Sequence, residues 1–502
     1  MACRILSAVV LFVTTLTALA QEPTIAPTSR YPANLSRVQV ADLNGDNAPE
    51  IIGLDNTSAA VVVLKNLGNG KYGPAHYYAI SGQPNGIAVG DFKGDGKLDV
   101  AVAIGAYNAT QGRVAVFRGI GDGTLQLPQY YTVAIPANSI AVADFNNDNR
   151  PDIAVIGNTS DNSTNTLAIL TNTVSSFTEH SFKATTYFTA NGFGPGADSI
   201  DDLVAGDFNG DGRIDLAYID GCAQCSVSEE ELFILSNTTS GWEPKMPTGG
   251  TGSFSLKAAD IDGDGLSDLV IPFAGCHTPC VGVSVIYMKK DFTVANSQAL
   301  DVFDTQDGPV PTEVVVGDFN NDGITDIAGY STGGLDLNFN QLPPGIMMWT
   351  GAGNRSFHKL KYYNQPNSTQ PVGLYTAAGF LDKNGTRDLV VPVGTETQVW
   401  MNSTSNSADP CAYPTSGGVH VCAPSANVPS GTVHFLASAR TNTQPLNRIE
   451  LWIDGHKKAQ VFTDRLQINL PVPNGKHTAA FFEVGASGLH IQKNVTFTVG
   501  GH

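Results

Sequence analysis

A nine-residue acidic loop recurs seven times along the chain, each time between two short apolar strands. The copies read ADLNGDNAPEIIG, GDFKGDGKLDVAV, ADFNNDNRPDIAV, GDFNGDGRIDLAY, ADIDGDGLSDLVI, GDFNNDGITDIAG and GFLDKNGTRDLVV. Successive copies are separated by 49 to 63 residues, which fits four short strands with their turns. The composition contains no long segment with a helical period, so seven copies predict seven four-stranded units of an all-β fold.

Side-chain oxygens stand at positions 1, 3, 5 and 9 of most copies, and a small or turn-forming residue often stands at position 6. Alternate side chains of a tight loop converge on one centre, and a backbone carbonyl at position 7 can add another oxygen. The candidate metal ligands, loop by loop, are Asp42, Asn44, Asp46 and Glu50; Asp91, Asp95 and Asp99; Asp144, Asn146, Asp148 and Asp152; Asp207, Asn209, Asp211 and Asp215; Asp260, Asp262, Asp264 and Asp268; Asp318, Asn320, Asp322 and Asp326; Asp382, Asn384 and Asp388.

Six or seven hard oxygens suit calcium, whereas magnesium demands a stricter octahedron and keeps more of its water. Zinc would require His or Cys, which these loops lack. Asp, Asn and Gly also favour turns, so a single loop has a structural explanation as well. Turn propensity does not explain an acid at position 9 in every copy. Calcium is therefore the predicted ligand, and the apolar residue at position 12, such as Ile271, disfavours an EF-hand.

The G-D-F-N-G-D-G-x-x-D-L runs resemble FG-GAP repeats, which occur in integrin α-subunit propellers and in exported bacterial proteins. The resemblance covers about residues 25 to 402. It implies a seven-bladed β-propeller over residues 21–402, with each calcium loop joining two neighbouring strands of one blade.

Three loops depart from the common pattern. Lys93 replaces the oxygen ligand at position 3 of the second loop, where it could partly neutralise the site or turn toward solvent. Phe380 occupies position 1 of the seventh loop, which keeps only two acids. Glu50 at position 9 of the first loop is a longer acid that remains compatible with coordination. We therefore expect about six calcium sites, with the loops at Asp91 and Phe380 the weakest.

Residues 1–20 begin with one basic residue, Arg4, continue through an apolar run and end on Ala18-Leu19-Ala20. This pattern predicts a secretory signal peptide. We expect the mature protein to be secreted, periplasmic or exposed at the cell surface, with no membrane span. The formal net charge of −18 makes nucleic acid and anionic membranes poor partners and bound cations plausible ones.

Six cysteines remain after Cys3 is removed with the signal peptide, and they fall into three close pairs: Cys222 with Cys225, Cys276 with Cys280, and Cys411 with Cys422. An even number in an exported protein predicts disulfides. We expect local bridges within each pair. A bridge between Cys222 and Cys276 is the alternative, because both follow equivalent strands of adjacent units.

A second domain is predicted after a polar linker at residues 403–410. Residues 411–502 lack the acidic repeat and contain short apolar strands with hairpin turns at Asp454-Gly455 and Asn474-Gly475. This pattern resembles a bacterial immunoglobulin-like sandwich. Trp452 is expected in its core, and a bridge between Cys411 and Cys422 at its entrance.

The array should close through its first residues. The seventh unit supplies only three strands before the linker, whereas residues 25–33 have the spacing of an outer strand without a unit of their own. An open array would expose an unpaired strand edge. The segment from Ile25 to Ala33 is therefore predicted to pair with the strand that contains Val399.

No H-E-x-x-H, G-x-S-x-G or P-loop motif occurs in the chain. The Asp201-Asp202 pair lies outside the loops and is interpreted as a solubilising strand edge. Asn-x-Ser/Thr sequons occur at Asn34, Asn56, Asn108, Asn237 and Asn402, among others. The leading hypothesis is a non-catalytic binding or adhesion module for an extracellular protein or glycan. The alternative is a calcium-dependent carbohydrate-active enzyme or a sugar-binding lectin.

Overall fold

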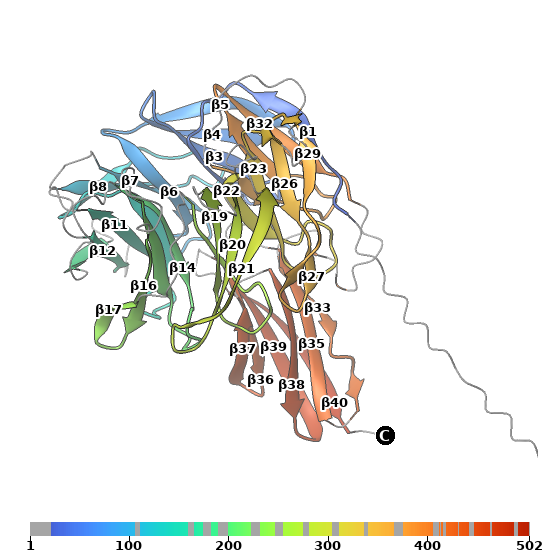
Figure 1. Cartoon of the computed structure of the whole chain (residues 1–502). Coiled ribbons are helices and arrows are strands. Elements are labelled where there is room, and N and C mark those ends of the chain that lie inside the picture. The colour runs from blue at the N-terminus through green and yellow to red at the C-terminus, as the bar shows by residue number, and fades with distance from the viewer. Residues whose placement is uncertain are drawn as a thin grey trace, which may run out of the picture.

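The structure is a computed structural model of the whole chain, shown in Figure 1. It describes residues 22–105, 111–158, 165–173, 182–188, 199–221, 231–245, 255–274, 281–303, 311–335, 340–365, 375–404, 411, 413–414, 418–429, 431–440, 446–461, 464–485 and 490–500. These residues form strands and turns and contain no α-helix. Accordingly, the described part of the chain has no helix of the length and apolarity that crossing a bilayer requires.

Seven four-stranded antiparallel sheets follow one another in the described residues up to Asn402. The first three contain β2 (Arg37–Ala41), β3 (Glu50–Asp55), β4 (Ala60–Asn66) and β5 (Tyr72–Ala79); β6 (Pro84–Gly90), β7 (Asp99–Ile104), β8 (Gly112–Phe117) and β9 (Gln129–Val133); β10 (Ser139–Ala143), β11 (Asp152–Asn158), β12 (Asn165–Asn172) and β13 (Phe182–Phe188). The next two contain β14 (Ser199–Gly206), β15 (Asp215–Gly221), β16 (Glu231–Thr238) and β17 (Gly241–Lys245); β18 (Lys257–Ala259), β19 (Asp268–Ala274), β20 (Val281–Met288) and β21 (Val294–Phe303). The last two contain β22 (Pro311–Gly317), β23 (Asp326–Ser331), β26 (Gly345–Trp349) and β29 (Lys361–Asn364); β30 (Ala377–Gly379), β31 (Asp388–Val393), β32 (Glu396–Asn402) and β1 (Ile25–Tyr31).

The first strands of these sheets make a closed ring. β2 contacts β6, and the contacts continue through β10, β14, β18, β22 and β30, which returns to β2. Each of these strands lies at an edge of its sheet, so their outer edges face a shared centre. The middle strands, such as β3 and β31, are buried along their whole length. Their Val- and Ile-rich sequences favour strands covered on both faces.

The ring closes as the sequence predicts. β1 pairs antiparallel with β32, and Ser29 lies opposite Val399. Ile25 is 5% exposed and packs in one cluster with Trp400. Thr24 adds a backbone hydrogen bond at the end of this pairing, since its carbonyl oxygen accepts from the Ser403 N–H at 2.8 Å. The first described residues therefore complete the last sheet.

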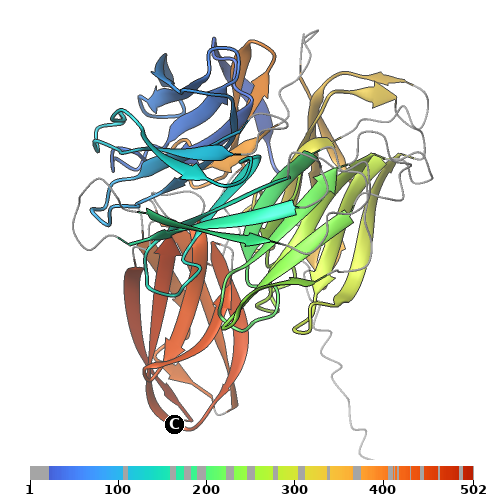
Figure 2. The same ribbon diagram turned by 90° about the vertical axis from the view of Figure 1, so that its left-hand side faces the viewer.

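The C-terminal residues form two further sheets around a core of their own. One sheet contains β33 (Gly418–Ala423), β35 (Gly431–Arg440) and β38 (Arg465–Val472). The other contains β34 (Asn427–Val428), β40 (His490–Val499), β39 (Gly475–Gly485), β36 (Leu446–Ile453) and β37 (His456–Val461). Two small separate hairpins, β24 (Gly334–Leu335) with β25 (Gln341–Leu342) and β27 (Gly351–Gly353) with β28 (Ser356–Phe357), connect strands of the sixth ring sheet along the chain. We call the pair of C-terminal sheets the sandwich; it is red in Figures 1 and 2 and lies against one end of the ring.

Two expectations about the sandwich can be compared with the structure. The Cys411–Cys422 disulfide is present, with a Cα–Cα distance of 5.6 Å. The prediction that Trp452 lies in the core is wrong. Alternation along β36 turns Leu451 and Ile453 inward, so Trp452 lies partly exposed on the other face, where it contacts the Phe482 ring.

The other two predicted disulfides are not found among the described residues. Cys225 is the predicted partner of Cys222, and Cys280 is the predicted partner of Cys276. Cys222, Cys225, Cys276 and Cys280 all lie outside the part of the chain that the structure describes. Neither bridge is therefore confirmed, and the local pairing of Cys225 and of Cys280 stays a prediction, as does the alternative bridge between Cys222 and Cys276.

Candidate metal loops and central cavity

The seven acidic loops each connect the first strand of a sheet to the second, as the resemblance implies. Because the first strands line the centre of the ring, the loops lie together at one end of it. Positions 4 and 6 adopt left-handed backbone conformations in six loops, for example Gly45 with φ 76° and Asn47 with φ 65°. The sequence analysis predicted a turn-forming residue only at position 6. Gly and Asn tolerate this conformation better than other residues, which explains why they recur there.

Within each of the first six loops, the acid at position 1 accepts hydrogen bonds from the loop backbone. In the fourth loop, Asp207 Oδ1 accepts from the Gly210 N–H at 2.6 Å, and its Oδ2 accepts from the Gly212 N–H at 2.9 Å. Asn209 and Asp211 accept from the backbone two residues further on. These bonds fold the loop around its carboxylates and fix the side chains that the sequence predicts as ligands.

The acid at position 9 has a structural role that sequence reasoning missed. In all seven loops it accepts a hydrogen bond from the N–H at position 2. Its second oxygen accepts from the backbone at the end of the third strand, as when Asp152 accepts from the Asn172 N–H at 2.7 Å. Position 9 thus ties loop and sheet together, which is a second reason for an acid there.

The fifth loop brings its acids together most clearly. One carboxylate oxygen from each of Asp260, Asp262 and Asp268 lies within 4.8 Å of the others, and Asp264 belongs to the same loop. Several hard oxygens at this separation are what a calcium ion requires. The donor set of oxygens without His or Cys fits calcium in the other complete loops as well.

Burial makes these carboxylates costly to ionise. Burial, together with the neighbouring acids of the same loop, raises the pKa of Glu50, Asp99 and Asp152 to about 7 and that of Asp215 to about 8. Backbone N–H donors oppose the shift. A dication among these groups would remove the repulsion and favour the ionised forms.

The second and seventh loops, which depart from the common sequence pattern, differ in what replaces the missing ligand. In the second loop, Lys93 Nζ lies 2.7 Å from Asp95 Oδ2, so it faces the loop acids rather than leaving them. In the seventh loop, the Phe380 ring packs against Tyr413 of the sandwich at a centroid distance of 5.1 Å. Arg387 and Arg440 stack on the same ring. Position 1 of this loop therefore contributes to an interdomain contact.

Four asparagines join neighbouring sheets, a structural role that the sequence analysis did not predict. Each lies at or next to the last residue of the third strand of its sheet and donates from Nδ2 to its own loop and to position 2 of the preceding loop; they are Asn66, Asn172, Asn237 and Asn402. The recurrence of K-N, T-N, S-N and M-N after an apolar strand was the available signal. Asn237 and Asn402 belong to sequons, yet both are buried, so their amides are unavailable for glycosylation in the folded chain.

A cavity of about 330 Å³ occupies the centre of the ring. Its walls come from the first strands, including Val40, Val89 and Val142, and Arg387 lines it on the loop side. Because Arg387 forms an ion pair with Asp464 of the sandwich, the sandwich covers this end of the cavity.

A charged group marks the other end of the cavity, which we call the mouth; it consists of Arg37, Asp202, Lys257, Glu313 and Tyr375. Lys257 Nζ lies 2.7 Å from Glu313 and 3.6 Å from Asp202, and Arg37 stacks on the Tyr375 ring at 4.0 Å. Burial raises the pKa of Glu313 to about 7, although Lys257 opposes the shift. The interpretation of Asp202 as a solubilising residue is wrong, since it is 7% exposed and joins a network that spans several sheets.

Two further expectations fall outside the described residues. The signal peptide at residues 1–20 is one, and the Asn108 sequon is the other. Both remain predictions from the sequence.

A comparison with known protein families identifies repeats in the ring. The FG-GAP-like repeat family matches residues 42–102 and 91–155, which include the first three loops. The chain is therefore an all-β protein that carries FG-GAP-like repeats. No curated protein matches it.

Similar solved structures include BBS1N in complex with ARL6DN, soaked with mercury, at 11% identity and a TM-score of 0.46, covering 77% of this chain and 100% of the other. The same complex soaked with lead has a TM-score of 0.48 at 11% identity and covers 77% and 98%. The extracellular domain of the putative hybrid two component system BT4673 from B. thetaiotaomicron has a TM-score of 0.43 at 9% identity and covers 96% and 60%.

Proposed function

We propose that this protein is an exported, calcium-binding FG-GAP repeat protein that acts as a non-catalytic binding or adhesion module. In this proposal the seven sheets are the blades of one propeller at residues 21–402, and residues 411–502 are an immunoglobulin-like domain after a linker at 403–410. The observation that carries it is the fifth loop, where Asp260, Asp262 and Asp268 bring carboxylate oxygens within 4.8 Å of one another. The bound calcium ions would fix the loop face and leave the mouth for a ligand.

The mouth is the favoured ligand surface because the sandwich covers the loop end of the cavity. It offers two cations, two carboxylates and the Tyr375 ring above apolar walls. Such a set can hydrogen-bond and stack on the polar, ring-containing groups of a glycan or on a protein side chain. A lectin or a calcium-dependent carbohydrate-active enzyme is the second candidate, favoured by the two carboxylates and the tyrosine gathered there.

Two measurements test the proposal. Isothermal titration of chelator-treated protein with calcium should reveal several sites, and the absence of calcium binding would reject the metal assignment. A glycan array probed with and without calcium should then separate the candidates. Sugar binding that is lost in Glu313→Gln favours the lectin or enzyme, whereas binding of extracellular proteins without sugar binding favours the adhesion module.

A further inference from the structure

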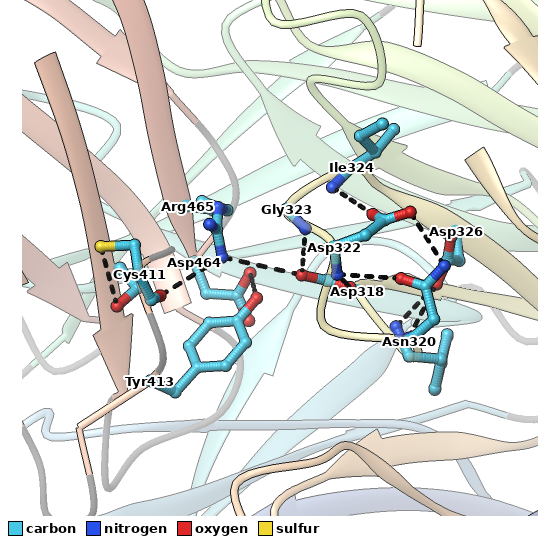
Figure 3. A network of polar contacts seen from close by, with 12 residues as sticks. Asp318, Asn320, Asp322, Gly323, Ile324, Asp326, Cys411, Tyr413, Asp464 and Arg465 are labelled. Atoms are coloured by element: carbon cyan, nitrogen blue, oxygen red, sulfur yellow. Dashed lines mark hydrogen bonds and ion pairs between the residues drawn. The ribbon is translucent and has the colours of Figure 1, made fainter. Parts of the chain in front are cut away.

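A sandwich cation enters the sixth acidic loop. Arg465, at the start of β38, places Nη1 3.8 Å from Asp318 Oδ2, and both side chains are more than nine-tenths buried. Figure 3 shows the guanidinium between this loop and the Cys411 carbonyl oxygen, to which Nη1 donates at 3.3 Å. It lies so close to Gly323 that a Cβ there would be 2.6 Å from Nε. Position 6 therefore must be glycine for Arg465 to fit.

The carboxylate that Arg465 faces is a proposed metal ligand. Asp318, Asp322 and Asp326 are the acids of this loop, and Asp318 Oδ2 also accepts from the Gly323 N–H at 2.9 Å. A calcium ion in the loop and the guanidinium would be attracted by the same negative charges and would repel each other. Repulsion between charges a few ångströms apart is weakly screened where both are buried.

The neighbouring fifth loop offers a comparison. Arg355 forms ion pairs with Asp262 and Asp264, the latter at 3.5 Å. Arg355 belongs to the turn of the β27–β28 hairpin and so to the ring itself. Its position does not depend on where the sandwich lies. Arg465, in contrast to Arg355, comes from the sandwich and therefore links an acidic loop of the ring to the other domain.

We propose that Arg465 is an interdomain counter-ion that lowers the calcium affinity of the sixth loop, and that calcium in this loop in turn loosens the adjacent edge of the sandwich. The coupling must act in both directions because binding free energies are reciprocal. This inference rests on the proposed calcium function. The Phe380–Tyr413 contact and the hydrogen bond from Arg440 to the Asp382 carbonyl oxygen involve the seventh loop, so they keep the sandwich attached while its Arg465 side responds.

Hydrogen exchange of the full chain, followed by mass spectrometry over a calcium titration, tests the coupling at the level of single loops. In the wild type, calcium should protect residues 318–326 and speed exchange at residues 465–472, which form β38. Arg465→Met removes the charge with similar side-chain length, and the calcium concentration at half-protection of 318–326 should fall about tenfold. Arg465→Lys keeps the charge and should stay within about threefold of the wild type.

Two controls assign the result. Arg30→Met removes a cation that pairs with Glu396 away from the loops, and it should leave the midpoint of 318–326 unchanged. Residues 260–268 should keep their midpoint in all variants. An unchanged or higher midpoint in a folded Arg465→Met protein would overturn the inference.

If Arg465→Met does not fold, the wild-type protein still tests the inference, since calcium that protects residues 465–472 together with 318–326 would also overturn it. Failure of the proposed function is distinguishable, because no loop of any variant would then be protected by calcium.

Discussion

Ser29 in β1 lies directly opposite Val399 in β32, so the beginning of the ring supplies the outer strand of its last sheet. Strand pairing between the two ends removes an exposed edge and ties the first described residues to the last sheet. We therefore expect the stability of the whole ring to depend on this closure.

Removal of residues 21–33 should destabilise the whole ring. The deletion exposes the edge of β32 and the apolar surface that Ile25 covers, so we expect the melting temperature to fall by more than about 5 °C. Ile25→Ala should reproduce part of the loss, and the exposed Arg30→Ala should cost little. Calorimetry checks the series. A deletion that melts like the wild type would show that closure does not stabilise the ring.

Chelation of calcium should lower the melting temperature. The loops hold 21 of the 46 acidic residues, and six dications would change the formal charge from −18 to −6. A ligand that binds only the folded state stabilises it by mass action, by about 2.7 kcal/mol at one hundred times the dissociation constant of a single site. Differential scanning fluorimetry with excess chelator or calcium measures this. Identical curves in both would refute the metal sites.

The metal-free protein should become less stable between about pH 5 and pH 8. Burial raises the folded-state pKa of Glu50, Asp99 and Asp152 to about 7, above values near 4 in an unfolded chain. Such groups stabilise the fold fully below the unfolded pKa, and this contribution is lost as the pH rises through about 7. Saturating calcium requires ionised carboxylates, so it should abolish or reverse the trend. Melting temperatures measured in chelator across this pH range check the prediction, and an increase with pH would contradict it.

The asparagine contacts between sheets should be costly to remove. Asn402→Ala deletes the donors to the Phe319 and Arg387 carbonyl oxygens, at 2.7 and 3.0 Å. Loss of two buried hydrogen bonds should lower the free energy of unfolding by about 2–4 kcal/mol. The exposed Asn56→Ala serves as the control and should stay within about 0.5 kcal/mol of the wild type. Chemical denaturation measures the free energy of unfolding of both variants. Equally small losses in the two would show that the Asn402 contacts do not stabilise the ring.

Glycosylation offers an independent check of the same burial. In a host that glycosylates exported proteins, Asn34 and Asn56 are exposed and available, whereas Asn237 and Asn402 are buried. Peptide mapping should find glycans at the first two sequons and none at the buried two. A glycan on Asn402 would mean that modification precedes folding there or that the amide is accessible.

Much of the ring could be predicted because its information is local. The spacing of the acidic loops, the alternation of apolar strands and the unpaired segment at Ile25 each depend on residues close together in sequence, and the four-stranded sheets and the β1–β32 pairing follow them. The Cys411–Cys422 bridge could also be predicted from the sequence, since only ten residues separate the two cysteines.

What the tertiary structure decided concerns residues whose partners are far away in the chain. From the sequence, Asp202 was interpreted as a surface acid, but in the structure it lies beside Lys257. Phe380 was interpreted as a lost ligand, but its ring packs against Tyr413. The approach of Arg465 to Asp318 likewise depends on how the sandwich lies against the ring. Local propensity determines strands and turns, but burial and charge pairing depend on which surfaces meet, and that is settled only when the whole chain packs.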